Sequence, residues 1–289
     1  MESAIAQAIK MQHEPVAILF SDEMPDGSVQ FAEGKWGCVM WLLLASATKG
    51  KPAAADRKTF GCLGGGAGLG FGNPYQDWPG GIECFYRFLS TGGGPQQGVG
   101  VSTPTTSPWL SRRASGDLVH GERYVKSPEL VKKFVDALPL TEVPRRFVVF
   151  KPLAQVRADE KPEVVVFLVD ADQLSALVVL ANYGRDTNNN VTMPWGAGCQ
   201  TIGIFAFREA LSPRPRAVVG LTDLSARKYV AQQVGHDLMT FAAPFALFQE
   251  MEENVAGSFL ERDTWRELME MRHSRTAVTS DEEKPAPRP

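Results

Sequence analysis

The sequence predicts an α/β or α+β fold, in which mixed sheets and flanking helices form two interlocked lobes around a glycine-rich central region. The length of 289 residues exceeds the commonest size of a single domain. Hydrophobic residues make up 44% and charged residues 22% of the chain, which is typical of a globular protein. Short apolar runs typical of buried strands alternate with longer stretches of helical periodicity.

The first third of the chain contains the patterns of three helices and one strand. Apolar residues at helical spacing predict a helix over residues 3–11, and an apolar run after Pro15 predicts a buried strand over 16–20. Residues 38–47 are apolar throughout and are followed by Gly50, which predicts a buried helix with Cys38 in its first turn. A short helix is predicted over 82–89.

Strands and helices also alternate in the remainder of the chain. Ser127 and Pro128 are typical of a helix start, because serine caps the free N–H groups and proline lacks one. Strands are predicted over 147–153, 164–169, 216–221 and 239–244, and helices over 127–138, 173–183, 199–210 and 245–271, the last interrupted at Gly257. We expect a single α/β unit over 1–273, alternatively divided into lobes 1–140 and 141–273, and a disordered tail over 274–289.

Glycine is concentrated in one part of the chain. About half of the 27 glycines lie between residues 61 and 100, and residues 94–107 have the composition of a loop or an irregular strand. Glycine has no Cβ and therefore allows a backbone to approach a ligand or another backbone closely. The run Gly64–Gly72 matches neither the GxGxxG dinucleotide motif nor a phosphate-binding P-loop, so a nucleotide site is disfavoured.

The charge balance and the hydropathy restrict the expected partners. Thirty basic and 33 acidic residues give a net charge of -3, which provides no positive field for nucleic acid. The longest apolar run is about half of the roughly 20 residues that a membrane span requires, and the N-terminus has no signal-peptide pattern. We therefore expect a cytoplasmic protein that binds neither nucleic acid nor membrane. A redox partner or a small molecule is expected, and the oligomeric state, a homodimer included, stays open.

The four cysteines are the strongest candidates for chemistry. Glycine directly precedes Cys38, Cys62 and Cys199, and an aromatic residue lies within four positions of each of the four, including Cys84. An iron-sulfur cluster needs converging thiolates, nearby backbone N–H groups and an apolar shell. The spacing matches no known zinc or ferredoxin pattern, so the cysteines could equally be structural thiols. A third hypothesis, a Cys62 or Cys199 nucleophile, lacks an obvious histidine partner.

Several short segments resemble the DUF169 family of uncharacterised prokaryotic proteins. They are Pro15-Val-Ala-Ile18, Cys38 and its helix, Phe60-Gly-Cys-Leu-Gly-Gly65, Gly198-Cys-Gln-Thr-Ile202 and Asp223-Leu-Ser-Ala-Arg-Lys-Tyr229. The resemblance extends from about residue 10 to 260 and implies a cysteine-bound iron-sulfur centre of unknown reaction. Three of the matching segments contain Cys38, Cys62 and Cys199, and Cys84 supplies the fourth thiolate that such a centre needs.

Our main hypothesis is a protein of redox or electron-transfer function with one [4Fe-4S] cluster. Its iron ligands would be Cys38, Cys62, Cys84 and Cys199. The residues expected to surround the cluster are Gly61, Gly64, Gly198, Trp36 and Trp195. The alternative is a cofactor-free protein that binds a small molecule or another protein and whose cysteines are structural.

Overall fold

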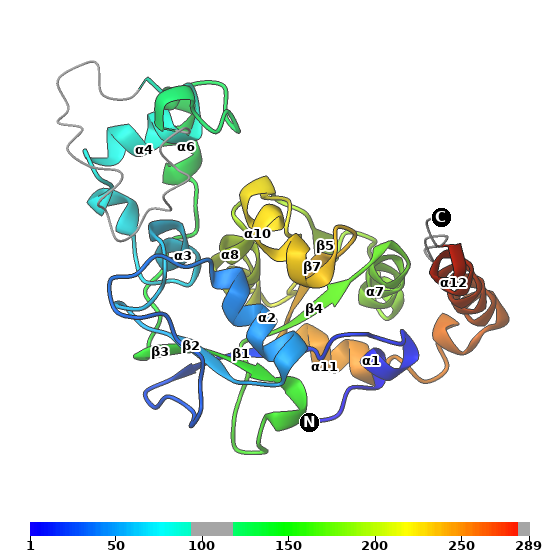
Figure 1. The fold of residues 1–289 in the computed structure, drawn as a ribbon. Coiled ribbons are helices and arrows are strands. Elements are labelled where there is room, and N and C mark those ends of the chain that lie inside the picture. The colour runs from blue at the N-terminus through cyan, green and yellow to red at the C-terminus, as the bar shows by residue number, and fades with distance from the viewer. Residues whose placement is uncertain (94–117, 283–289) are drawn as a thin grey trace, which may run out of the picture.

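A seven-stranded mixed sheet forms the centre of the molecule (Figure 1). The structure is a computed structural model that describes residues 1–93 and 118–282. The strand order in the sheet is β2-β3-β1-β4-β7-β6-β5. The strands are β1 (Val16–Ser21), β2 (Ala53–Ala55), β3 (Phe147–Pro152), β4 (Val164–Val169), β5 (Val191–Thr192), β6 (Ala217–Gly220) and β7 (Met239–Pro244). β5 and β6 are parallel, whereas the other neighbouring pairs are antiparallel.

The central strand β1 shows why the sheet is covered on both faces. Alternate side chains of a strand point to opposite faces, and in β1 Val16 and Ile18 join one hydrophobic core while Ala17 and Leu19 join the other. All four side chains are buried. A strand that is apolar on both faces is stable only between two layers of helices.

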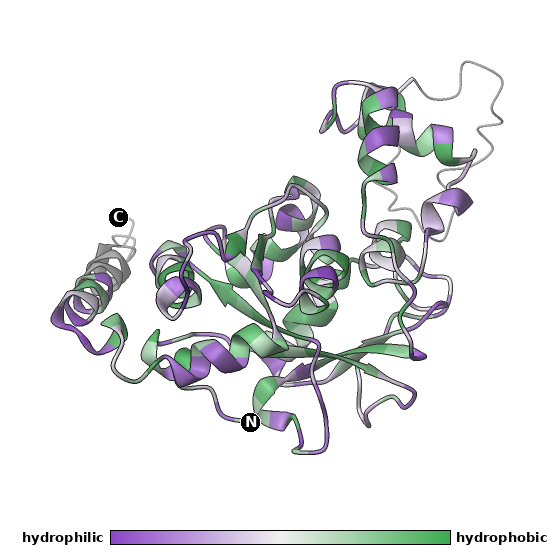
Figure 2. Ribbon diagram, turned by 180° about the vertical axis from the view of Figure 1, so that it is seen from behind, coloured by the Kyte–Doolittle hydropathy of each residue, from purple (hydrophilic) through white to green (hydrophobic). Residues whose placement is uncertain are grey.

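Helices pack against both faces of the sheet and leave their polar residues outside (Figure 2). One face is covered by α2 (Val39–Lys49), α3 (Leu63–Gly68), α8 (Gly198–Ile202), α9 (Ile204–Ala210) and α10 (Leu224–Val234). The other is covered by α1 (Ala4–Ala8), α7 (Ala171–Tyr183), α11 (Phe245–Glu253) and the first turns of α12 (Asp263–Glu282). The predicted α/β class is therefore confirmed.

A small helical unit stands at one end of the molecule, next to α3 (Figure 1). It consists of the 3-10 helix η1 (Pro74–Asp77), α4 (Ile82–Leu89) and α6 (Pro128–Asp136). Its apolar side chains, such as Phe85 and Val131, belong to the same hydrophobic core as α2 and α3. The helical unit is thus packed on the body of the protein and forms one side of the junction described below.

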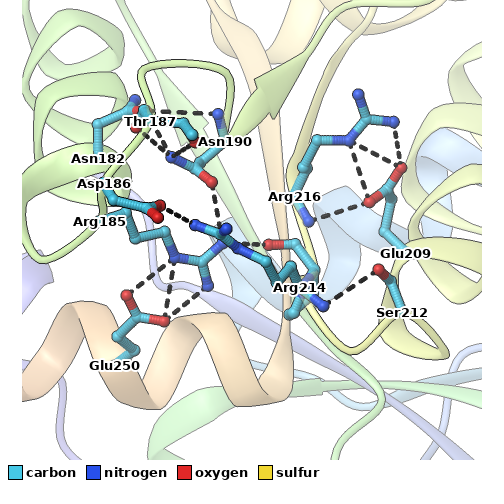
Figure 3. A network of polar contacts seen from close by, with 11 residues as sticks. Asn182, Arg185, Asp186, Thr187, Asn190, Glu209, Ser212, Arg214, Arg216 and Glu250 are labelled. Carbon is cyan, nitrogen blue, oxygen red and sulfur yellow. Dashed lines mark hydrogen bonds and ion pairs between the residues drawn. The ribbon is translucent and has the colours of Figure 1, made fainter.

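A polar network fixes the loops at the β5 end of the sheet (Figure 3). The Arg185 guanidinium is almost fully buried and pairs with Glu250 of α11. It also donates a hydrogen bond of 2.7 Å to the Pro215 carbonyl and one of 3.2 Å to Asn190. These contacts connect three segments that are distant in the sequence, and this network lies apart from the cysteine residues.

Several elements differ from the sequence prediction. The helix expected over 199–210 is divided into α8 and α9 at Gly203, and the glycine run forms the helix α3. The α12 helix extends from Asp263 to Glu282. Residues 283–289 of the tail predicted over 274–289 lie outside the described residues. The loop predicted over 94–107 lies outside the described residues. In the described part of the chain no helix is both long and apolar enough to span a membrane.

Candidate functional site

A cavity of about 340 Å³ lies at the junction between the helical unit and the body of the protein. Its polar end contains Cys38, Cys62, Cys199 and Asp223, which come from the starts of four helices. A cavity of this size is within the range of small-molecule sites.

The helix starts explain why polar side chains face this cavity. Cys38, Cys62 and Asp223 are the N-cap residues of α2, α3 and α10, and Cys199 is the second residue of α8. The first N–H groups of a helix have no partner inside the helix and need acceptors from neighbouring side chains. The Cys62 sulfur accepts from the Gly65 N–H at 3.2 Å, and the Asp223 carboxylate accepts from the Ser225 N–H at 2.9 Å.

The three thiols at the cavity are protonated at neutral pH. Burial raises the pKa of Cys62 to about 11, and the negative charge of Asp223 adds to this effect, although the Gly65 N–H opposes it. Burial, together with the other thiols, also raises the pKa of Cys38 and that of Cys199. The Cys199 S–H donates to the Gly64 carbonyl at 3.1 Å. A neutral thiol is a weak nucleophile, so this environment disfavours cysteine catalysis.

The predicted [4Fe-4S] cluster is wrong. Within residues 1–93 and 118–282, no group of three cysteine, histidine, aspartate or glutamate residues is arranged to hold a metal ion. Cys84 lies on α4, does not line the cavity and packs as a partly buried apolar residue against the core. The thiols of Cys62 and Cys199 make hydrogen bonds to the backbone of α3 instead. The prediction of an iron-sulfur protein is therefore wrong, and all four cysteines are free thiols.

Of the five residues predicted to surround the cluster, four line the cavity and one does not. Trp36, Gly64, Trp195 and Gly198 line the cavity together with the three thiols. Gly61 does not: its φ is +83°, and a Cβ there would approach the Gly37 carbonyl oxygen to 2.4 Å. Gly61 is therefore required for close packing of two backbone segments.

Aromatic residues are prominent in the lining of the cavity. Nine aromatic residues line it: Trp36, Tyr75, Trp78, Phe85, Phe88, Tyr124, Phe134, Trp195 and Tyr229. Many are in contact with one another, as shown by the 5.2 Å between the ring centroids of Trp36 and Tyr229. Tyr75 and Phe85 are stacked at 4.2 Å. Contacts of this kind hold the rings in place before any ligand arrives.

Several polar residues of the cavity are not among the candidates that the sequence indicates. Ser225 donates to Glu122 at 2.7 Å, and its backbone N–H donates to the Tyr124 hydroxyl at 3.1 Å. Gln200 donates to the Tyr75 hydroxyl at 3.1 Å. Burial raises the pKa of Asp223, whereas the backbone N–H groups around its carboxylate oppose that effect. The sequence signal for Asp223 is the Asp-Leu-Ser pattern of a helix N-cap, which indicates a helix but not a site.

Two more features complete the cavity. Trp78 is only 6% exposed and lines the cavity, yet its indole N–H is buried and has no hydrogen-bond partner among the described residues. Two neighbouring basic residues differ in their roles: Lys228 lines the cavity, whereas Arg227 donates to the carbonyls of Leu221 and Leu238 at 3.1 Å each and so has a structural role.

The fold and the cavity together define an α/β protein with an aromatic, thiol-containing pocket between its sheet and a helical unit. The chain matches the family model described as uncharacterised ArCR, DUF169, over residues 4–254. It therefore belongs to the DUF169 family, as the short sequence segments indicate. No curated protein and no solved structure shows significant similarity to the chain.

Proposed function

We propose that this protein binds a small organic molecule, without a metal or other cofactor, in the cavity at the junction. The observation that carries the proposal is the set of nine aromatic residues around a space of about 340 Å³. Such a surface favours a ligand with a flat or apolar body, because aromatic side chains bury much apolar area and stack on planar groups. Trp36, Gly64, Trp195 and Gly198 are proposed ligand contacts.

The polar groups of the cavity support a ligand that also carries hydrogen-bonding atoms. An unsatisfied buried donor costs free energy, and the Trp78 N–H is such a donor in the described chain. A ligand oxygen or nitrogen within reach of this indole would remove that cost. The free thiols favour a reducing compartment, and the cytoplasm is our proposed location.

The binding proposal can be tested with the neutral fluorophore N-phenyl-1-naphthylamine, whose emission increases when it leaves water. A Cβ on Gly64 would make only ordinary contacts, 3.7 Å from the Tyr75 hydroxyl and 3.9 Å from the Cys62 sulfur. The Gly64→Leu side chain should therefore occupy the cavity without moving the backbone. We expect one site per chain in the parent protein and an affinity at least roughly tenfold lower in Gly64→Leu.

The matched control is Ala171→Leu, which adds the same side chain at an exposed position at the start of α7. This variant should bind the probe like the parent. If Gly64→Leu does not fold, as judged by circular dichroism, Ala197→Leu, at another residue that lines the cavity, replaces it. A parent protein that binds no probe, or a folded cavity-filling variant that binds it unchanged, contradicts the proposal.

A further inference from the structure

We propose that the ligand carries a positive charge on nitrogen, as a protonated amine or a quaternary ammonium group, attached to its apolar body. This inference rests on the proposed function and specifies the chemical class of the ligand. It follows from the charge of Asp223, from its surroundings and from the kind of aromatic surface that faces it.

Asp223 is a partly buried carboxylate that has no ion-pair partner among the described residues. Its oxygens accept from the N–H groups of Ser225 and Ala226 at 2.9 and 3.3 Å. Among residues 1–93 and 118–282 it forms no ion pair, although Lys228 lines the same cavity. Removing a carboxylate from water is costly unless hydrogen bonds or a positive charge compensate it. The N–H groups at the start of α10 compensate part of this cost, and a cationic ligand group would add the positive charge that no ion pair supplies.

The negative charge of Asp223 acts on the whole polar end of the cavity. It contributes to the raised pKa of Cys38, Cys62 and Cys199, all of which line the same cavity. The positive ends of α3 and α10 are already capped by Cys62 and Asp223. At these two helix starts an anionic ligand would therefore meet a capped end and, at α10, a carboxylate.

The aromatic surface favours a cation for a second, independent reason. The faces of indole and phenol rings carry negative charge density and attract organic cations, as in the aromatic cages that bind quaternary ammonium groups. Trp36 and Tyr229 are in contact on one side, and Trp195 contacts Tyr124 at 5.8 Å and Phe134 at 4.9 Å on another. The described residues offer no metal site, so an organic cation is the fitting occupant.

Three compounds with the same phenylethyl body test the charge directly. Isothermal titration calorimetry at neutral pH and low salt would compare 2-phenylethylammonium, neutral 2-phenylethanol and anionic 3-phenylpropanoate. We expect the ammonium ion to bind roughly tenfold more tightly than the alcohol, and the carboxylate to bind most weakly. The inference is overturned if the alcohol or the carboxylate binds as tightly as the ammonium ion, or if the ammonium ion does not bind in the millimolar range.

The variant Asp223→Asn removes the charge while asparagine still caps α10. It should lower the affinity for the ammonium ion roughly tenfold and leave the affinity for the alcohol unchanged. Asp237→Asn is the matched control, because it makes the same chemical change at an exposed position outside the cavity. Equal effects of both variants on ammonium binding would contradict the inference.

The two proposals can fail separately. If Gly64→Leu weakens binding of the neutral fluorophore, the cavity binds organic molecules, whatever the charge of the natural ligand. If this weakening is observed and the ammonium ion shows no preference, the charge inference fails and the binding proposal stands. If the fluorophore binds Gly64→Leu unchanged, the binding proposal itself fails.

Discussion

The Cys62 thiol combines two roles that have opposite effects on its proton. As the N-cap of α3 it accepts the Gly65 N–H, which stabilises a thiolate, but burial favours the neutral thiol more strongly and raises its pKa to about 11. The thiol therefore caps the helix as a neutral group. Its polar contact is with the backbone of its own helix, so the glycine and aromatic neighbours from which the sequence predicts a cluster do not make Cys62 a metal ligand.

The raised pKa of Cys62 makes stability depend on alkaline pH. The ordinary value is 9.0 and the folded value is about 11, so between these values the folded state binds more protons than the unfolded state. The free energy of unfolding should therefore fall as the pH rises from about 9 to about 11, by on the order of 2 kcal/mol from this residue.

Urea unfolding of the parent and of Cys62→Ser at neutral and alkaline pH measures this contribution. Serine caps a helix well and does not titrate in this range, so the variant should lose less stability at high pH than the parent. An identical pH dependence in both proteins would show that the Cys62 thiol does not carry the effect.

The helix α3 illustrates how packing can override local preference. Its sequence Leu-Gly-Gly-Gly-Ala-Gly has a poor intrinsic tendency to form a helix, so the sequence indicates a loop. In the fold this helix packs against α8 so closely that a Cβ on Gly68 would lie 2.7 Å from the Cys199 sulfur. Glycine is required at that position by the neighbouring helix, because any side chain would separate the two elements.

Two alanine substitutions in α3 separate the effect of packing against α8 from the effect of helix propensity on stability. Gly68→Ala should lower the free energy of unfolding by about 2 kcal/mol, because the new methyl group overlaps Cys199. Gly64→Ala makes only ordinary contacts and should raise the stability by about 0.5 kcal/mol through its better helix propensity. Chemical denaturation of both variants measures the difference. Equal changes in the two variants would mean that contact with α8 does not select glycine.

At the scale of the whole molecule, the strands and the long helices can be predicted from the sequence. The chemistry of the cavity cannot be predicted in this way. Apolar runs such as 164–169 form strands because any fold must bury them. The sequence around Cys38, Cys62 and Cys199 does indicate where the cavity lies, because all three residues line it. Glycine and aromatic residues near these cysteines allow the segments to pack closely there. The cluster prediction was wrong because sequence proximity to glycine says nothing about where a thiol points. Asp223 and Tyr75 were missed because only the tertiary fold brings them to the thiols.

The position of β1 in the sheet also determines the order in which the chain can fold during synthesis. β1 lies between β3 and β4, and β2 is hydrogen-bonded to β3 and not to β1. Until Phe147 has left the ribosome, the two strands already made, β1 and β2, lack their common neighbour β3 in the sheet. A fragment of residues 1–146 should therefore lack cooperative unfolding and should bind hydrophobic dyes, whereas the full chain should unfold cooperatively. A sigmoidal thermal transition of that fragment, followed by circular dichroism, would show that the N-terminal part can fold before the strand on either side of β1 exists.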